Sequence, residues 1–171
     1  MSARAPNALR LRAGWPAPVS GLLLAAWLGA ALYFSVVGTR AAFAVLPSRA
    51  MAGVLVGQTL PVLFETGILV GACLVALALR SARGIERTAS LVGGAIIAAL
   101  SAVARFVILA RIARLRLSMP AAVDSLAVTD PARRAFGQLH AASVGALGLA
   151  MLTGIVVAVV LANSLSAVSH D

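Results

Sequence analysis

Apolar residues occur in four long runs along the chain, separated by short stretches that carry most of the charge. The runs cover about residues 20–46, 50–79, 88–115 and 131–164. Each is long enough for the roughly 20 helical residues that cross about 30 Å of hydrocarbon. Because backbone polar groups in lipid must be satisfied within their own segment, the pattern predicts an all-α integral membrane bundle of four transmembrane helices with short loops.

The segments outside this domain are short: a basic segment over residues 1–19 and a tail over residues 165–171. Arginines before the first apolar run resemble the start of a secretory signal. The uncharged stretch is long for a signal, however, and three more spans follow it. We therefore expect a retained first span, with Trp15 and Pro16 at the membrane interface before it.

The connections carry signals for helix starts and stops. Ser48 is placed to cap the second helix, and Asp130 with Pro131 to begin the fourth. Gly84 is expected near the C-cap of the second helix. The longest connection, about residues 117–129, has room for a short interfacial helix.

Composition supports a membrane protein. Hydrophobic residues make up 61% of the chain and charged residues 11%, with a mean hydropathy of +1.02, whereas a soluble chain is about half apolar and about a quarter charged. The net charge of +9 comes from arginine, and most of these arginines flank the apolar runs, where they meet lipid headgroups. We therefore expect the lipid bilayer as partner and no nucleic acid.

Charge gives only a weak indication of orientation. We call side A the side of the first and third connections, and side B the side of both termini and the second connection. Arginines are nearly balanced between the two sides, and the first helix usually decides. An arginine-only, alanine-rich composition is typical of high-GC bacterial coding sequences. We expect a bacterial inner membrane, with both termini in the cytoplasm.

Glycine placement predicts the faces where helices pack. Gly53, Gly57, Gly67 and Gly71 fall within about 40° of one line on the second helix. In lipid, small residues let helices approach closely, so this face is expected to contact other helices. Similar faces occur on the third and fourth helices, with Gly94, Ala98 and Ala102 on one and Gly137, Ala141 and Gly145 on the other. A homodimer face is the alternative interpretation.

Polar side chains at membrane depth form the candidate site, because they are costly in lipid. They are Glu65, Arg105, His140, Arg40, Gln58 and Gln138. At 1.5 Å per residue, Glu65 lies about 22 Å and Arg105 about 15 Å from side A. A shift of the helix ends by a few residues brings the two side chains to the same level. The polar residues fall in the middle and in the side-A half, which predicts a polar interior on one side. Pro61 predicts a kink that frees a carbonyl near Gln58.

Several roles stay open for these groups. Glu65 and Arg105 form a structural ion pair, or they belong to a proton, ion or substrate path, or Arg105 reaches the headgroups and leaves Glu65 neutral. His140 is a hydrogen-bonded or water-facing histidine, or a proton relay. Haem needs a second histidine at a similar depth, but the other, His170, lies in the tail. Zinc or copper needs more ligands, so we expect no metal and no cofactor.

Two stretches carry a family resemblance. The first comprises Trp27–Gly29, Phe34–Leu46, Leu46–Gly53 and Val56–Gly57, and the second is Phe136–Ser143. They resemble the bacterial membrane domain of unknown function grouped with the human transmembrane protein 205. The resemblance implies four membrane helices in this order, without a settled activity. It also implies that Leu139, His140 and Ser143 are motif residues of unassigned role.

These observations favour a small non-enzymatic multi-pass membrane protein with a scaffold, assembly or minor transport role. No nucleophile motif or phosphate-binding loop is present in the sequence. The alternative is a proton-coupled small-solute transporter or channel that uses Glu65, Arg105 and His140. A redox or quinone-associated subunit is disfavoured by the shortage of ligands. A homo-oligomer or a membrane-protein partner is compatible with the glycine faces.

Overall fold

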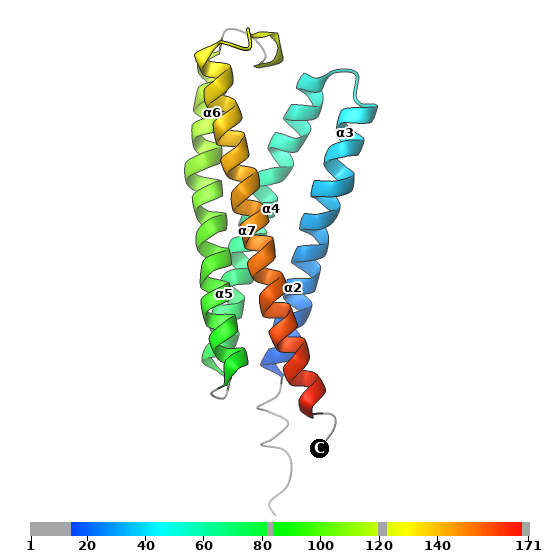
Figure 1. The fold of residues 1–171 in the computed structure, drawn as a ribbon, viewed down its shortest axis with the longest axis vertical. Helices are drawn as coiled ribbons and strands as arrows, with labels where there is room; N and C mark the ends of the chain where they lie inside the picture. The colour runs from blue at the N-terminus through cyan, green and yellow to red at the C-terminus, as the bar shows by residue number, and fades with distance from the viewer. Residues whose placement is uncertain (1–14, 82–83, 120–122, 169–171) are drawn as a thin grey trace, which may run out of the picture.

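Long apolar runs form continuous helices in the computed structural model of the chain, which describes residues 15–81, 84–119 and 123–168. Four helical runs within these ranges are long and apolar enough to cross a bilayer: Pro16–Val45, Arg49–Leu79, Ile85–Ser118 and Pro131–Ser164. Many large apolar side chains on them, such as Leu22 and Leu69, are exposed. In lipid these side chains meet hydrocarbon. The predicted all-α bundle of four transmembrane helices is confirmed (Figure 1).

The first two spans meet at the first side-A connection. The first comprises α2 (Pro16–Tyr33), η1 (Phe34–Gly38) and α3 (Thr39–Val45), and the second is α4 (Arg49–Leu79). Because proline fits the first turn of a helix, α2 begins at Pro16 rather than near residue 20.

The last two spans meet at the longest connection. The third comprises α5 (Ile85–Ala102), η2 (Val103–Ile108) and α6 (Leu109–Ser118), and the fourth is α7 (Pro131–Val168). Between them lies the 3-10 helix η3 (Val123–Ser125), in the stretch predicted to hold a short helix. Both η1 and η2 are π-helical segments, which arise in helices at irregular and often functional positions.

The helix caps largely follow the predictions. Ser48 Oγ accepts a hydrogen bond from the Met51 amide at 3.2 Å, and Asp130 Oδ1 accepts one from the Ala132 amide at 2.7 Å. The prediction for Gly84 is wrong. α4 ends at Leu79, and Gly84 is instead the N-cap of α5, where its backbone is extended.

The four spans form a ring, but they do not pack equally along its length. α4 packs against α5, α5 against α7, α7 against α2, and α2 against α4. On side B the helices gather closely, whereas on side A the α3–α4 pair diverges from the α6–α7 pair (Figure 1). The bundle is therefore closed at one end and split at the other.

Glycines allow the close packing on side B. A Cβ atom at Gly71 would lie 2.5 Å from the Gly94 carbonyl oxygen, and one at Gly94 would lie 2.7 Å from the Gly71 carbonyl oxygen. The backbones of α4 and α5 thus touch where neither residue has a side chain. This contact anchors the closed end of the bundle.

Candidate functional site

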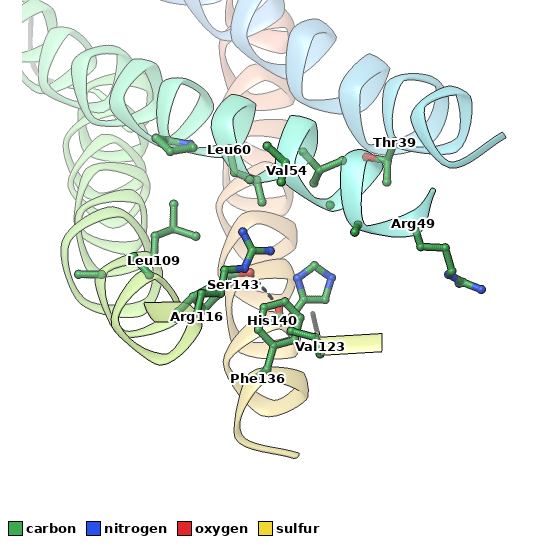
Figure 2. A pocket seen from close by; sticks show the side chains of 18 of the residues that line it. Thr39, Arg49, Val54, Leu60, Leu109, Arg116, Val123, Phe136, His140 and Ser143 are labelled. Carbon is green, nitrogen blue, oxygen red and sulfur yellow. Dashed lines mark hydrogen bonds between the residues drawn. The ribbon is translucent and has the colours of Figure 1, made fainter. Parts of the chain in front are cut away.

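A cavity of about 650 Å³ lies in the side-A half, between the diverging helix pairs (Figure 2). It extends from Arg49 and Met119 at the loop end to Pro61 on α4 and Ser143 on α7. At 1.5 Å per residue, the stretch from Arg49 to Pro61 spans about 18 Å. The cavity therefore reaches from the side-A surface to about the middle of the bilayer.

Apolar side chains form most of the inner wall. Val56 and Leu60 on α4 face the cavity together with Leu109 and Ile112 on α6. Phe43 on α3 adds an aromatic ring nearer the loop end. Small-molecule sites typically have this volume and this combination of apolar walls with a few polar groups.

Three arginines and one histidine dominate the polar part of the wall. Arg49, Arg105, Arg116 and His140 all line the cavity. The described residues of this lining include no carboxylate. The cavity is therefore suited to a ligand with negative charge.

Arg116 occupies a central position among these groups. Its Cζ lies 5.2 Å from the centre of the Phe136 ring, which in turn stacks on the His140 ring at 6.1 Å between centres. A Cβ atom at Gly57 would lie only 3.0 Å from Arg116 Nη1, so the guanidinium of Arg116 reaches across to α4. Figure 2 shows Arg116, Phe136 and His140 together at the cavity.

The backbone around this guanidinium is polar as well. Because Pro61 has no amide proton, it cannot bond the Gly57 carbonyl in the usual helical way. Ser143 Oγ is buried and donates a hydrogen bond to the His140 carbonyl at 2.8 Å. Across the cavity, Gly57 and Pro61 on α4 thus lie opposite Arg116 on α6 and His140 on α7.

The predicted ion pair is present at the inner end of the cavity. Arg105 Nε lies 2.7 Å from Glu65 Oε1. Arg105 belongs to the π-helical segment η2 and lines the cavity, whereas Glu65 does not. The Glu65 side chain is 47% exposed and that of Arg105 is 32% exposed, so the pair lies at the outer surface between α4 and η2. Glu65 neutralises the deepest cation of the cavity.

A densely packed layer lies on the side-B side of the cavity. Trp27 Nε1 donates a hydrogen bond to the Leu63 carbonyl at 3.2 Å, and Phe64 is fully buried beside them. A Cβ atom at Gly67 would lie 2.5 Å from Ser101 Oγ and 3.1 Å from the Trp27 ring. The layer begins one helical turn beyond Leu60, at the inner end of the cavity lining, and we call it the floor.

The structure brings together only part of the predicted polar cluster. Arg105 and His140 line the cavity, with Glu65 bound to Arg105 from outside. Gln58, Gln138 and Arg40 are exposed and do not line it. The prediction of one shared polar interior is wrong for these three. Gln58 lies on the same outward face of α4 as Glu65. A long arginine side chain such as that of Arg40 extends towards the membrane interface.

The four glycines predicted to form one packing face on α4 fall into two pairs with different surroundings. Gly67 and Gly71 lie in helix contacts, whereas Gly53 has nothing within 4 Å of a Cβ position and Gly57 faces Arg116. The expectation of a continuous packing face on α4 is therefore wrong in the side-A half, where the cavity replaces the neighbouring helix.

The glycine faces on the other two spans also differ. Gly94 on α5 meets α4 as predicted, but Gly137 and Gly145 on α7 have nothing within 4 Å of a Cβ position. α7 instead packs through a different face, which includes Ser143, Leu147 and Ala150.

Sequence reasoning missed Arg49, Arg116 and Phe136 as site residues. It counted both arginines with those that meet lipid headgroups. A usable signal was the spacing of Phe136 and His140, four residues apart on one helical face.

Metal chemistry finds no support in the part of the chain that the structure describes. No three His, Cys, Asp or Glu side chains gather there in a way that would hold a metal ion. Cys73 is a free thiol exposed on α4.

Comparison with known proteins places the chain in a family. The family model described as domain of unknown function DUF4149 matches residues 22–121, which covers most of the first three spans. No curated protein and no solved structure matches the chain. The match extends over more than half of the chain, and the protein therefore belongs to the DUF4149 family, a membrane domain of the bacterial type whose function is unknown.

Proposed function

We propose that this protein is a non-enzymatic membrane protein that binds a small ligand in the side-A cavity. It acts as a binding component of a transport or assembly process rather than as a channel. The observation that carries the proposal is the one-sided cavity of about 650 Å³ above a packed floor. Such a cavity can receive a ligand from side A, while the layer around Trp27 and Phe64 separates it from side B.

Orientation and wider kinship belong to the same proposal. We infer a bacterial inner membrane with both termini in the cytoplasm, because the first helix usually determines orientation. The cavity then faces away from the cytoplasm. The grouping with human transmembrane protein 205 rests on the sequence motif of Leu139, His140 and Ser143, of which His140 and Ser143 line the cavity.

A proton-coupled transporter receives less support. Glu65, the carboxylate such a mechanism would use, lies outside the cavity and is paired with Arg105. Solute flux in proteoliposomes that changes in both His140→Ala and Glu65→Gln would favour the transporter over the proposal.

Thiol labelling tests access to the cavity. In a Cys73→Ser background, Gly53→Cys places a thiol on the cavity wall, where the position has room. Val62→Cys is the matched control, because Val62 lies on the same helix, is 57% exposed and does not line the cavity. A small anionic, membrane-impermeant thiosulfonate is added to vesicles from each side.

The expected result is rapid labelling of the Gly53→Cys thiol from side A alone and slow labelling of the Val62→Cys thiol from both sides. Water reaches a cavity, whereas lipid covers an outward apolar face. Equal slow labelling at both positions would show that the cavity is closed to water. Labelling of the Gly53→Cys thiol from side B would show a channel, and either result would refute the proposal.

A further inference from the structure

The cavity wall is divided by chemistry along the membrane normal. Near the loop end and across the middle of the cavity lie Arg49, Arg116 and His140. Further in, the wall is apolar through Leu60, Leu109 and neighbouring residues. A ligand that enters from side A therefore meets Arg49 and Arg116 before it meets the apolar wall around Leu60.

The cations differ in how far they are neutralised. Arg105 at the inner end is bound to Glu65 at 2.7 Å. Arg116 instead contacts the face of the Phe136 ring, which attracts the cation without removing its charge. Its guanidinium keeps hydrogen-bond donors free for an oxyanion, and such charge-assisted, bidentate bonds are the strong ones.

Size excludes a simple inorganic anion as the full occupant. A phosphate or carboxylate bound at Arg116 fills only a small part of about 650 Å³. The remaining apolar wall faces inward at membrane depth, where burial of hydrocarbon is favourable compared with water. A ligand that uses the whole cavity has one anionic end and one apolar body.

We infer that the cavity binds an anionic amphiphile, with its phosphate or carboxylate at Arg116 and His140 and its hydrocarbon chain along Leu60 and Leu109. This inference rests on the proposed function and names the ligand class for the same site. Two sources supply such chemistry: a lipid of the surrounding leaflet, or a soluble amphiphile that enters from side A. The order of charged and apolar residues along the wall suits both sources, because in either case the anionic end of the ligand points towards side A.

Binding to the full chain in phosphatidylcholine nanodiscs tests the inference. Three probes are added from water. Palmitoyl lysophosphatidate has both the chain and the phosphate, monopalmitoylglycerol has the chain without the charge, and inorganic phosphate has the charge without the chain. A fourth arm places phosphatidate in the nanodisc as a leaflet lipid. The readout is equilibrium binding of radiolabelled ligand, supported by the shift in Tm.

We expect either lysophosphatidate or phosphatidate to bind at least about tenfold more tightly than the uncharged and chainless probes, since charge-assisted hydrogen bonds and hydrocarbon burial are both needed. The tighter of these two arms identifies the source. Equal binding of monopalmitoylglycerol would show that the cations are not used. Equal binding of inorganic phosphate would show that the chain is not used, and either outcome overturns the inference.

Arginine variants locate the anionic end. Arg116→Met should weaken lysophosphatidate or phosphatidate binding by about tenfold or more, because it removes a charge-assisted contact. Arg114→Met is the matched control, since Arg114 lies on the same helix, is exposed, and does not line the cavity. If Arg116→Met fails to fold, Arg116→Lys, which keeps the charge but loses the planar fork, should weaken binding less than tenfold but more than Arg114→Met.

Equal binding by the Arg116 and Arg114 variants would overturn the assignment of Arg116. The two proposals fail in different ways. A cavity that labels from side A but binds none of the amphiphiles refutes this inference and leaves the proposed function standing. A cavity that does not label refutes the proposed function itself.

Discussion

Two pairs of glycines on α4 have the same spacing but opposite surroundings. Gly67 and Gly71 lie against α2 and α5, whereas Gly53 and Gly57 line the cavity. The difference lies in the residues opposite them. Gly71 faces Gly94, so that two backbones touch, while Gly57 faces the guanidinium of Arg116. Small residues four apart permit a close helix contact but do not ensure one, because the residue on the opposite helix decides whether the helices meet.

The same comparison explains why the bundle is split on side A. Arg116 on the third span carries a charge that cannot be covered by an apolar helix without large cost. The α3–α4 pair and the α6–α7 pair diverge, and Arg116 lines the cavity between them (Figure 1). On side B, Gly71 of α4 meets Gly94 of α5, and the helices close.

Adding a methyl group at the closed end should have the largest effect on stability. Gly71→Ala places a Cβ atom 2.5 Å from the Gly94 carbonyl oxygen and 2.8 Å from the Ala98 amide nitrogen. Both are backbone atoms, so the helices must separate, and we expect a loss of about 3 kcal/mol or more in unfolding free energy, at the upper end for overpacking. Thermal or denaturant unfolding in nanodiscs measures it.

The matched change at the open end is Gly53→Ala on the same helix. Nothing lies within 4 Å of its Cβ position, so stability should be unchanged or higher by up to about 1 kcal/mol from helix propensity alone. If both variants lose stability equally, the contrast between the two halves of α4 is incorrect.

Breaking the ion pair at the boundary of the two halves should have the next largest effect. Glu65→Gln leaves Arg105 without its carboxylate near the middle of the bilayer, and we expect a loss of about 2.5 kcal/mol. Arg105→Met should cost less, since the carboxylate that it leaves behind is the more exposed of the two side chains, at 47% against 32%. Unfolding of the two single variants and of the double variant completes a double-mutant cycle.

The double variant should be more stable than Glu65→Gln, because it removes both charges. A double variant that is no more stable than either single variant would show that Glu65 and Arg105 do not stabilise each other. The chain would then tolerate Arg105 through water in the cavity alone.

Prediction from sequence succeeded where one span determines the result by itself. Hydrophobic run length fixed the four spans, and local polar groups fixed the caps at Ser48 and Asp130. The Glu65–Arg105 pair was also predictable, because few charges share that depth.

Prediction failed where the answer depends on what lies opposite a residue. Sequence periodicity places Gly57 and Gly71 on one face but does not show that Arg116 faces one and Gly94 the other. Sequence periodicity likewise gives the depth of His140 but does not show that Phe136 stacks on it. It gives the depth of Gln58 but does not show that this side chain points outward. Divergence of the helices is a property of the assembled bundle.

The floor between the two halves gives a smaller predicted effect. Trp27→Phe removes the hydrogen bond from Nε1 to the Leu63 carbonyl and keeps an aromatic ring in the packed layer. We expect a loss of about 1.5 kcal/mol in unfolding free energy, from the unpaired bond and a partly emptied site. Trp15→Phe is the control, since Trp15 is 46% exposed. Equal stability of the two variants would show that Trp27 does not hold the floor.

The smallest expected change in stability, at Gly57, has the clearest consequence for function. A Cβ atom in Gly57→Ala would lie 3.0 Å from Arg116 Nη1, the far end of a flexible side chain that can shift by a few tenths of an ångström. Stability should therefore change by less than about 0.5 kcal/mol, as for most substitutions outside a packed core. Because the guanidinium must move, affinity for the anionic amphiphile should fall by roughly threefold or more, whereas Gly53→Ala, which has no neighbour to displace, should leave it unchanged. A Gly57→Ala protein that loses stability as Gly71→Ala does would mean that Gly57 packs against a helix, and that the two ends of α4 are alike after all.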